Sequence, residues 1–151
     1  MTIWVDADAC PRPIKDIICR AAIRTQTECL FVANQSISLP NSPLLKSIQV
    51  MAGYDVADNE IVNRSNAGDL VITQDIPLAA ELVEKAVFVL TPRGEWLNSN
   101  NVRQRLMMRD FNETLRASGM HSGGPSPLNQ KDRMAFGNQL DSWLARHKPK
   151  K

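Results

Sequence analysis

The feature that most constrains the fold is an alternation of short apolar runs with amphipathic stretches over the first ninety residues. The apolar runs have the length of buried strands, and the stretches between most of them repeat apolar residues every three or four positions, which is helical spacing. Strands that alternate with helices are typical of a parallel sheet covered on both faces. The sequence therefore predicts an α/β fold with strands at 3–6, 29–33, 48–51, 70–73 and 87–90, and helices after Pro11, over 56–65 and over 77–85.

The last third of the chain has a different pattern. Two long helical stretches, 102–118 and 130–147, flank a loop rich in glycine and proline, and no strand is expected after them. Asn129, three residues before an aspartate, is a signal for the start of the final helix. Because 151 residues suit one domain, we expect a three-layer domain with a strand and helix core over 1–92, a helical part over 93–147 and a frayed tail at 148–151.

Composition excludes several classes of protein. The N-terminus has no basic segment followed by a long apolar one, and nowhere do about 18 apolar residues run together, so we expect a cytoplasmic protein that makes no use of a membrane. Three cysteines without a Cys-x-x-Cys pair indicate neither a disulfide framework nor a zinc knuckle. Two histidines in all disfavour chemistry built on several histidines.

Charge is distributed unevenly along the chain. Residues 1–92 hold 7 Lys/Arg against 11 Asp/Glu, whereas residues 93–151 hold 11 against 5, so the two parts carry net charges of −4 and +6. A solvated basic helix face and a surface that binds a polyanion both explain the basic part.

Aspartates follow the predicted strands, where ligands bind in open parallel sheets. Asp6 and Asp8 follow the first strand, Asp75 follows the strand at 70–73, and Asp58 falls in the first turn of the preceding helix. Carboxylates gathered at one edge repel one another and are stabilised by a cation. Mg²⁺ or Mn²⁺ suits such oxygen ligands and activates water against a phosphodiester, so we predict a metal site made of these four residues and hydrolysis of a phosphodiester.

Each acid also has a structural explanation. Asp8 and Asp75 are placed to cap the helices that follow them, Asp58 is placed to cap its own helix, and Asp69 is best explained as a turn residue. Cys10 adjoins the acids near a helix start, and we interpret it as a packing thiol.

Phosphate-binding groups are expected in the C-terminal part. The backbone of Gly123 and Gly124, with Lys131 and Arg133 after it, offers amides and cations to a phosphate. Arg109 and Arg116 lie seven residues apart on one helix face, as either a substrate clamp or a solvated stripe.

Three motifs in order resemble the YaiI/YqxD family over nearly the whole chain. They are segment 5–11, segment 68–79, and Gly123-Gly-Pro125 with Asp132, Arg133 and Phe136. The resemblance implies a PIN-like domain with additional C-terminal helices. The wider PIN-like group includes metal-dependent ribonucleases, and Asp6, Asp58 and Asp75 match the positions of their acids, which implies that these three residues are the catalytic groups. The resemblance therefore implies a nuclease with RNA favoured over DNA as the substrate.

Two other functions remain open. One is a haloacid-dehalogenase-like phosphatase with Asp6 as nucleophile, Asp8 as acid and Asp69 or Asp75 on magnesium, although Thr73 and the available lysines fit its motif order poorly. The other is a module that binds RNA or a protein without turnover through its basic helices. The oligomeric state is left open.

Overall fold

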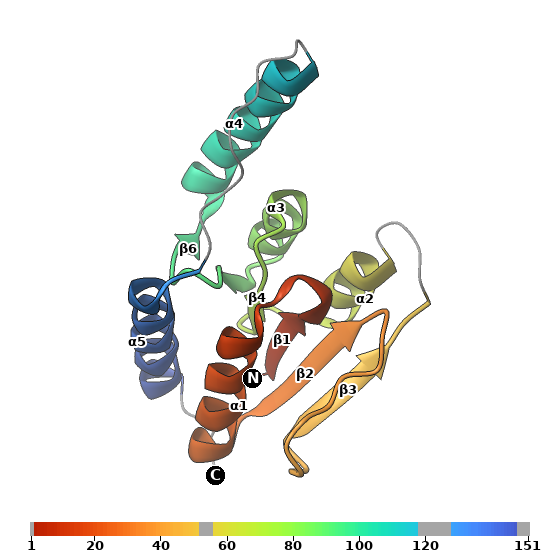
Figure 1. Ribbon diagram of the computed structural model, residues 1–151, viewed down its shortest axis with the longest axis vertical. Coiled ribbons are helices and arrows are strands. Elements are labelled where there is room, and N and C mark those ends of the chain that lie inside the picture. The colour runs from red at the N-terminus through yellow and green to blue at the C-terminus, as the bar shows by residue number, and fades with distance from the viewer. Residues whose placement is uncertain (1, 52–55, 118–127, 148–151) are drawn as a thin grey trace.

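The computed structural model describes residues 2–51, 56–117 and 128–147, with the side chains of Ala9 and of 109–117 outside that description (Figure 1). Six strands form one sheet in the order β3-β2-β1-β4-β5-β6, in which β1 to β5 are parallel and β6 is antiparallel to β5. The strands are β1 (Thr2–Asp6), β2 (Glu28–Ala33), β3 (Leu45–Gln49), β4 (Leu70–Ile72), β5 (Phe88–Leu90) and β6 (Trp96–Leu97).

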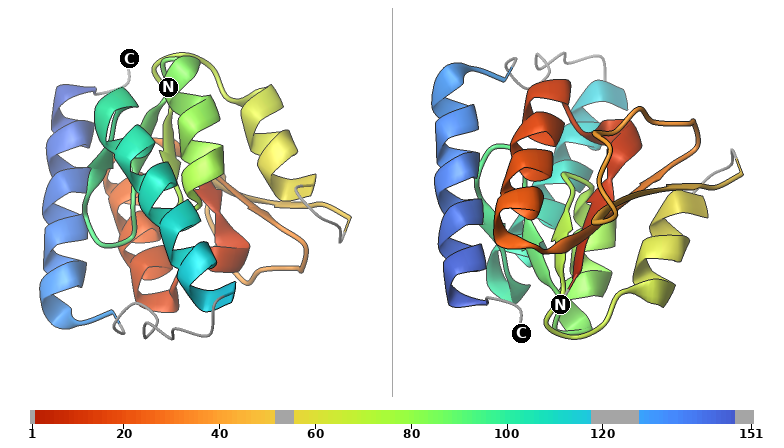
Figure 2. Two further views of the ribbon diagram at one scale, coloured as in Figure 1. Left: turned by 90° about the horizontal axis from the view of Figure 1, so that it is seen from above. Right: turned by 90° about the horizontal axis from the view of Figure 1, so that it is seen from below.

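Helices cover both faces of the sheet, which confirms the predicted α/β class (Figure 2). One face carries two of the α-helices and the other face carries three. They are α1 (Arg12–Thr25) and α5 (Gln130–Arg146) on the first face, and α2 (Val56–Arg64), α3 (Ile76–Glu84) and α4 (Ser99–Ala117) on the second, and a short 3₁₀ helix η1 (Ala7–Ala9) joins β1 to α1.

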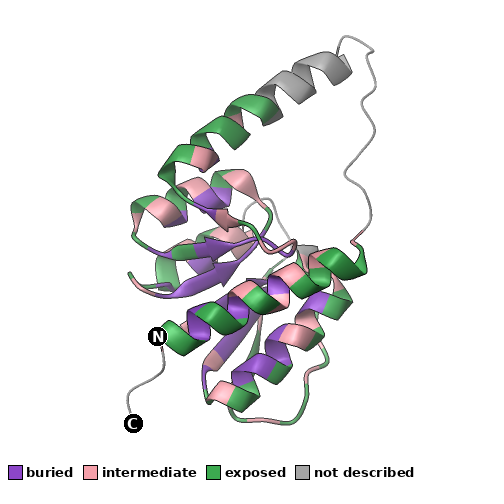
Figure 3. Cartoon of the chain, turned by 90° about the vertical axis from the view of Figure 1, so that its left-hand side faces the viewer, coloured by how far each residue is buried: buried purple, intermediate pink, exposed green. Residues whose placement is uncertain are grey.

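Each face of the sheet has its own apolar core, because successive residues of a strand point to opposite sides. In β1, Ile3 and Val5 pack with α1 and α5, whereas Trp4 packs with α2, α3 and α4. Strands β1, β2 and β4 are buried almost throughout and the helices expose their outer sides (Figure 3). Residues buried on both faces explain why the strand sequences read as continuous apolar runs.

Two strand predictions were wrong in detail. The third strand begins at Leu45, three residues before the predicted 48–51, since β3 lies at the edge of the sheet and tolerates exposed Lys46 and Ser47. The short strand β6 falls within the part expected to be helical, so the sheet extends past residue 92. Two residues are too few to show a periodic pattern.

The turn between β5 and β6 packs directly on α5. Gly94 has φ +85°, and a Cβ built there would lie 2.6 Å from the carbonyl carbon of Ala135. Next to it, Arg93 Nη1 forms an ion pair with Asp132 Oδ2 at 2.7 Å. Asp132 also completes the capping box of Asn129, which confirms the predicted start of the final helix.

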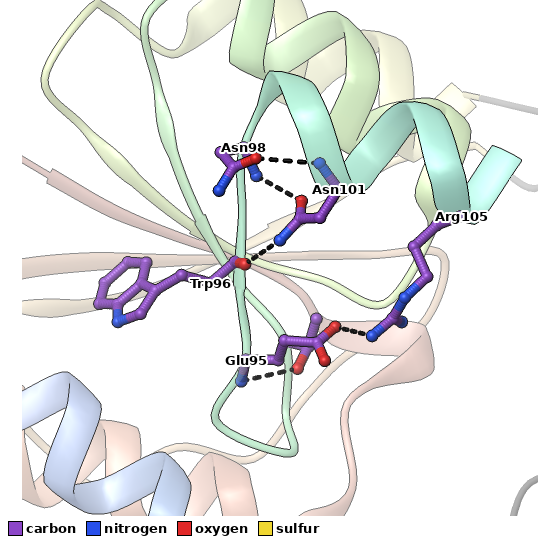
Figure 4. A network of polar contacts seen from close by, with 6 residues as sticks. Glu95, Trp96, Asn98, Asn101 and Arg105 are labelled. Carbon is purple, nitrogen blue, oxygen red and sulfur yellow. Dashed lines mark hydrogen bonds and ion pairs between the residues drawn. The ribbon is translucent and has the colours of Figure 1, made fainter.

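A set of polar contacts attaches α4 to β6 (Figure 4). The backbone N–H of Asn98 donates to Asn101 Oδ1 at 2.7 Å, and Asn101 Nδ2 donates to the carbonyl of Trp96, also at 2.7 Å. One turn further on, Arg105 pairs with Glu95. The direction in which α4 leaves the sheet is thus set by its first turns. Of the helices in the described ranges, none is long and apolar enough to cross a membrane.

Candidate active site at the carboxyl ends of the strands

The strand order places the chain's topological switch between β1 and β4. From β1 the chain moves outward through β2 to β3, then returns to the other side of β1 and continues through β4 and β5. In such sheets ligands bind at the carboxyl ends of the two strands that flank the switch. Asp6 is the last residue of β1 and Asp75 lies three residues after β4, so two predicted acids flank this point.

Asp6 is a buried carboxylate that accepts a hydrogen bond from Thr73. Its side chain is 7% exposed, and Thr73 Oγ1 donates to Asp6 Oδ2 at 3.0 Å. Burial raises the pKa of Asp6, and the charges of Asp75 and Asp8 raise it further, while the Thr73 hydrogen bond lowers it. The ionised form of Asp6 is therefore disfavoured by its own surroundings.

Asp75 caps a helix and belongs to the same group. Its Oδ1 accepts the N–H of Leu78 at 3.1 Å, which makes Asp75 the N-cap of α3. Its own N–H donates to Thr73 Oγ1 at 3.0 Å. Since Thr73 also donates to Asp6, this buried hydroxyl links the two carboxylate residues. Within the described residues, the cap hydrogen bond engages only Oδ1 of Asp75, so capping is compatible with a ligand on Oδ2.

Asp8 is held by the end of β2. The N–H of Asn34 donates to Asp8 Oδ2 at 2.8 Å. The N-cap of α1 is Pro11, so the alternative that Asp8 caps this helix was wrong. Asn34 Oδ1 is buried and has no hydrogen-bond partner in the described part of the chain. The residue whose backbone holds Asp8 therefore also carries an amide oxygen that is available as an oxygen donor.

The other two acids differ from each other in position. Asp58 is the third residue of α2, not its N-cap, and α2 begins at the carboxyl edge because it connects the end of β3 to the start of β4. Asp69 lies at the opposite edge, where its carboxylate accepts the N–H groups of Thr2 and Asn66 and the indole N–H of Trp4. The interpretation of Asp69 as a turn residue is confirmed, and Asp69 stands apart from Asp6.

The donor chemistry of this edge fits a hard divalent cation. Asp6, Asp8, Asp75 and the amide of Asn34 all offer oxygen. In the described ranges, however, no three His, Cys, Asp or Glu side chains lie close enough together to hold one ion, so the predicted carboxylates do not form a compact ligand cage. Mg²⁺ commonly uses one or two protein carboxylates and completes its shell with water and substrate phosphate. A site of that open kind is the one these residues fit.

The predicted phosphate-binding residues fall into two groups. Gly123 and Gly124 lie outside the described residues. Arg109 and Arg116 lie on α4, but their side chains are outside the description. Lys131 and Arg133 are exposed near the start of α5. Arg133 lines a cavity of about 310 Å³ together with Arg12 and Arg20 of α1, neither of which was predicted.

Cys10, next to the acids, lies where its thiolate form is disfavoured. Burial raises its pKa to about 12, the charge of Asp6 raises it and that of Lys15 lowers it. The other two cysteines are buried in the core and all three thiols are free. The packing interpretation of Cys10 agrees with this environment.

A second cavity of about 490 Å³ lies away from the acids, beside β5 and β6. Its walls are largely apolar and aromatic, with Phe88, Trp96 and Trp143 among them, and it includes none of the predicted site residues. The chemistry expected from the sequence is therefore at the carboxyl edge and not in this cavity.

Thr73 and Asn34 are the site residues that sequence reasoning missed. Thr73 was considered only as part of a phosphatase motif, and Asn34 was not considered. Asn34 directly follows the apolar run of β2, so the rule that selected Asp6 also selects Asn34 once polar amides are included.

The fold and its edge thus define a doubly wound α/β domain with an acidic site at the topological switch. The chain belongs to the YaiI/YqxD family, whose model, described as "Uncharacterized BCR, YaiI/YqxD family", matches residues 4–146. It is 62% identical to a UPF0178 protein of Shewanella amazonensis, over 97% of this chain and 98% of that protein. It is 58% identical to a UPF0178 protein of Proteus mirabilis over the full length of both chains. No solved structure matches the chain.

Proposed function

We propose that this protein is a divalent-metal-dependent phosphodiesterase of the cytoplasm that acts on nucleic acid, with RNA favoured over DNA. The observation that carries the proposal is the burial of Asp6 at the topological switch, next to the charges of Asp75 and Asp8. Such carboxylates favour a bound cation because a cation offsets both their burial and their mutual repulsion. Resemblance to the acid pattern of PIN-like ribonucleases supports the same reaction, and free thiols suit a reducing compartment.

Each residue of the site has its own role in this proposal. Asp6 and Asp75, linked through Thr73, would hold Mg²⁺ or Mn²⁺, with Asp8 and the Asn34 amide as further oxygen donors. When bound, the ion supplies charge neutralisation at the phosphate and a water of lowered pKa. Thr73 holds the carboxylate of Asp6 and, through the backbone N–H of Asp75, the residue that carries the second carboxylate.

The test is cleavage of single-stranded RNA with Mg²⁺, with Mn²⁺ and with EDTA. We expect cleavage with either metal, none in EDTA, and a loss of at least about 100-fold in Asp6→Asn. Glu84→Gln is the matched control, since Glu84 is exposed at the other end of α3 from Asp75. Equal cleavage by Asp6→Asn and the wild type would refute the proposal. RNA binding without cleavage under any condition would favour the non-catalytic binding module, and hydrolysis of small phosphomonoesters alone would favour the phosphatase.

A further inference from the structure

A cavity of about 310 Å³ lies along the seam between α1 and α5. It is lined by Arg12, Pro13, Asp16, Ile17 and Arg20 from α1 and by Arg133 from α5. The three residues Arg12, Asp16 and Arg20 repeat every four positions and therefore share one face of α1. Pro13 and Ile17 supply the apolar part of its lining.

The arginines of this cavity differ from four of the other arginines in the described ranges. Arg24, Arg64, Arg93 and Arg105 each pair with a carboxylate. Arg12, Arg20 and Arg133 form no ion pair with any residue that the structure describes, and Arg20 Nε donates only to the backbone carbonyl of Asp16, at 3.4 Å. Three guanidinium groups against one carboxylate give the lining a net charge of +2. Guanidinium groups held at one site repel one another, and an anion relieves that repulsion.

The cavity also lies toward the acidic edge of the sheet. Helices α1 and α5 run side by side in the same direction, since a Cβ at Gly137 would lie 3.9 Å from Ile17 Cγ2 and Arg24 pairs with Asp141 further along both helices. Helix α1 starts at the carboxyl edge because it follows β1, so both helices begin there. Arg12 is the first residue of α1 and Arg133 the fourth of α5, where the partial positive charge of a helix N-terminus adds to their own.

We propose that this cavity binds a phosphate group of a single-stranded nucleic acid, with Arg12 and Arg133 on opposite walls and Arg20 as a third donor. The fork of N–H groups on a guanidinium matches phosphate oxygens, and a cavity walled by two helices holds such a group better than a flat surface does. That the phosphate belongs to a nucleic acid rests on the proposed function, whereas the anion site itself does not. The backbone of a nucleic acid bound in this cavity is directed toward the carboxylates at the ends of β1 and β4.

The test is the affinity for a single-stranded RNA oligonucleotide in EDTA, measured by fluorescence anisotropy over a series of salt concentrations. We expect Arg12→Gln/Arg133→Gln to weaken binding at least about tenfold at low salt. The slope of log affinity against log salt should also fall by about 0.7, because the cavity holds one phosphate and each phosphate contact on a single strand contributes about 0.7. The matched control, Arg103→Gln/Arg146→Gln, removes the same charge from two other exposed arginines and should leave the slope nearly unchanged.

Two further probes identify the ligand. An oligonucleotide of the same sequence with an uncharged methylphosphonate backbone should bind the wild type no better than the Arg12→Gln/Arg133→Gln variant binds RNA. Equal losses in the two double variants, or equal binding of charged and uncharged oligonucleotides, would overturn the proposal. Pyrophosphate that binds the wild type but not the variant, with RNA affinity unaffected, would overturn its nucleic-acid part. All these binding measurements are made in EDTA and do not depend on metal binding or cleavage. An absence of metal binding or cleavage would therefore refute the proposed function, and the test of the anion site would still stand.

Discussion

Replacing Asp6 by asparagine should make the metal-free protein more stable at neutral pH. The substitution keeps the shape of the side chain, and the amide oxygen still accepts the hydrogen bond of Thr73 Oγ1, so this buried hydroxyl keeps its acceptor. What it removes is a buried charge that Asp75 and Asp8 oppose. We expect a gain of about 1 kcal/mol in the free energy of unfolding at pH 7, within the range seen when a functional-site compromise is removed. For a chain of this size, about 1 kcal/mol raises Tm by roughly 2–4 °C.

The gain should depend on pH in a defined direction. Because the folded protein raises the pKa of Asp6 above its ordinary 3.8, the folded state binds more protons than the unfolded chain just above that value. The stability of the wild type therefore falls as pH rises through the folded pKa of Asp6. Below the ordinary pKa both states are protonated, and the difference between wild type and Asp6→Asn should disappear.

Adding a divalent metal should reverse the order of stability. A ligand present at 100 times its Kd stabilises the folded state by about 2.7 kcal/mol, which exceeds the gain of about 1 kcal/mol from Asp6→Asn. The wild type should then have the higher Tm. The assay is thermal unfolding of both proteins in EDTA and in Mg²⁺, with Glu84→Gln as control. An Asp6→Asn variant less stable than the wild type in EDTA at pH 7, or equal stabilisation of both proteins by Mg²⁺, would refute the reasoning.

Three other substitutions or probes test separate parts of the structure. Gly94→Ala should lower the free energy of unfolding by about 2–5 kcal/mol, because the added Cβ overlaps the backbone of α5 and φ is positive. Gly68→Ala has a positive φ of +91° but open space around the Cβ, so it should lower the free energy of unfolding by only about 1–2 kcal/mol. Equal losses for the two variants in urea unfolding would contradict the packing of the turn at Gly94. Asp69→Ala should cost about 3 kcal/mol by leaving three N–H donors without an acceptor, yet leave Mg²⁺ affinity unchanged; a loss of Mg²⁺ affinity would return Asp69 to the site. Cys10, with a pKa of about 12, should react with iodoacetamide at pH 8 at least about 100-fold more slowly than an exposed thiol, and labelling at the rate of an exposed thiol would show that its burial is wrong.

The parts of the fold that follow from local pattern could be predicted from the sequence. The apolar run that ends at Asp6 and the one that precedes Asp75 each have the signature of a buried strand, and parallel strands necessarily bring their carboxyl ends to one edge. The α/β class and the placement of both acids at one edge of the sheet therefore follow from short segments alone. Strand β6 could not be predicted, because its two residues are defined by their pairing with β5 and by the turn at Gly94.

The details of the site depend on the order of the strands in the sheet, and no local segment of the sequence determines that order. Thr73 reaches Asp6 only because β4 pairs with β1, and Asn34 reaches Asp8 only because β2 pairs with β1 on the other side. In the same way, Arg12 and Arg133 share a cavity although 120 positions separate them in the chain, since α5 packs beside α1. Such neighbours emerge from tertiary packing and can be found only once the strand order is known.

The central claim is that the carboxyl edge binds a divalent cation through Asp6 and Asp75. It is tested most directly by isothermal titration of Mg²⁺ and Mn²⁺ into the wild type and into Asp6→Asn/Asp75→Asn, in which asparagine can still cap α3 and accept from Thr73. We predict saturable binding of either metal by the wild type and its loss in a double variant that remains folded. Absence of metal binding by the wild type, or unchanged binding by the folded double variant, would contradict the claim.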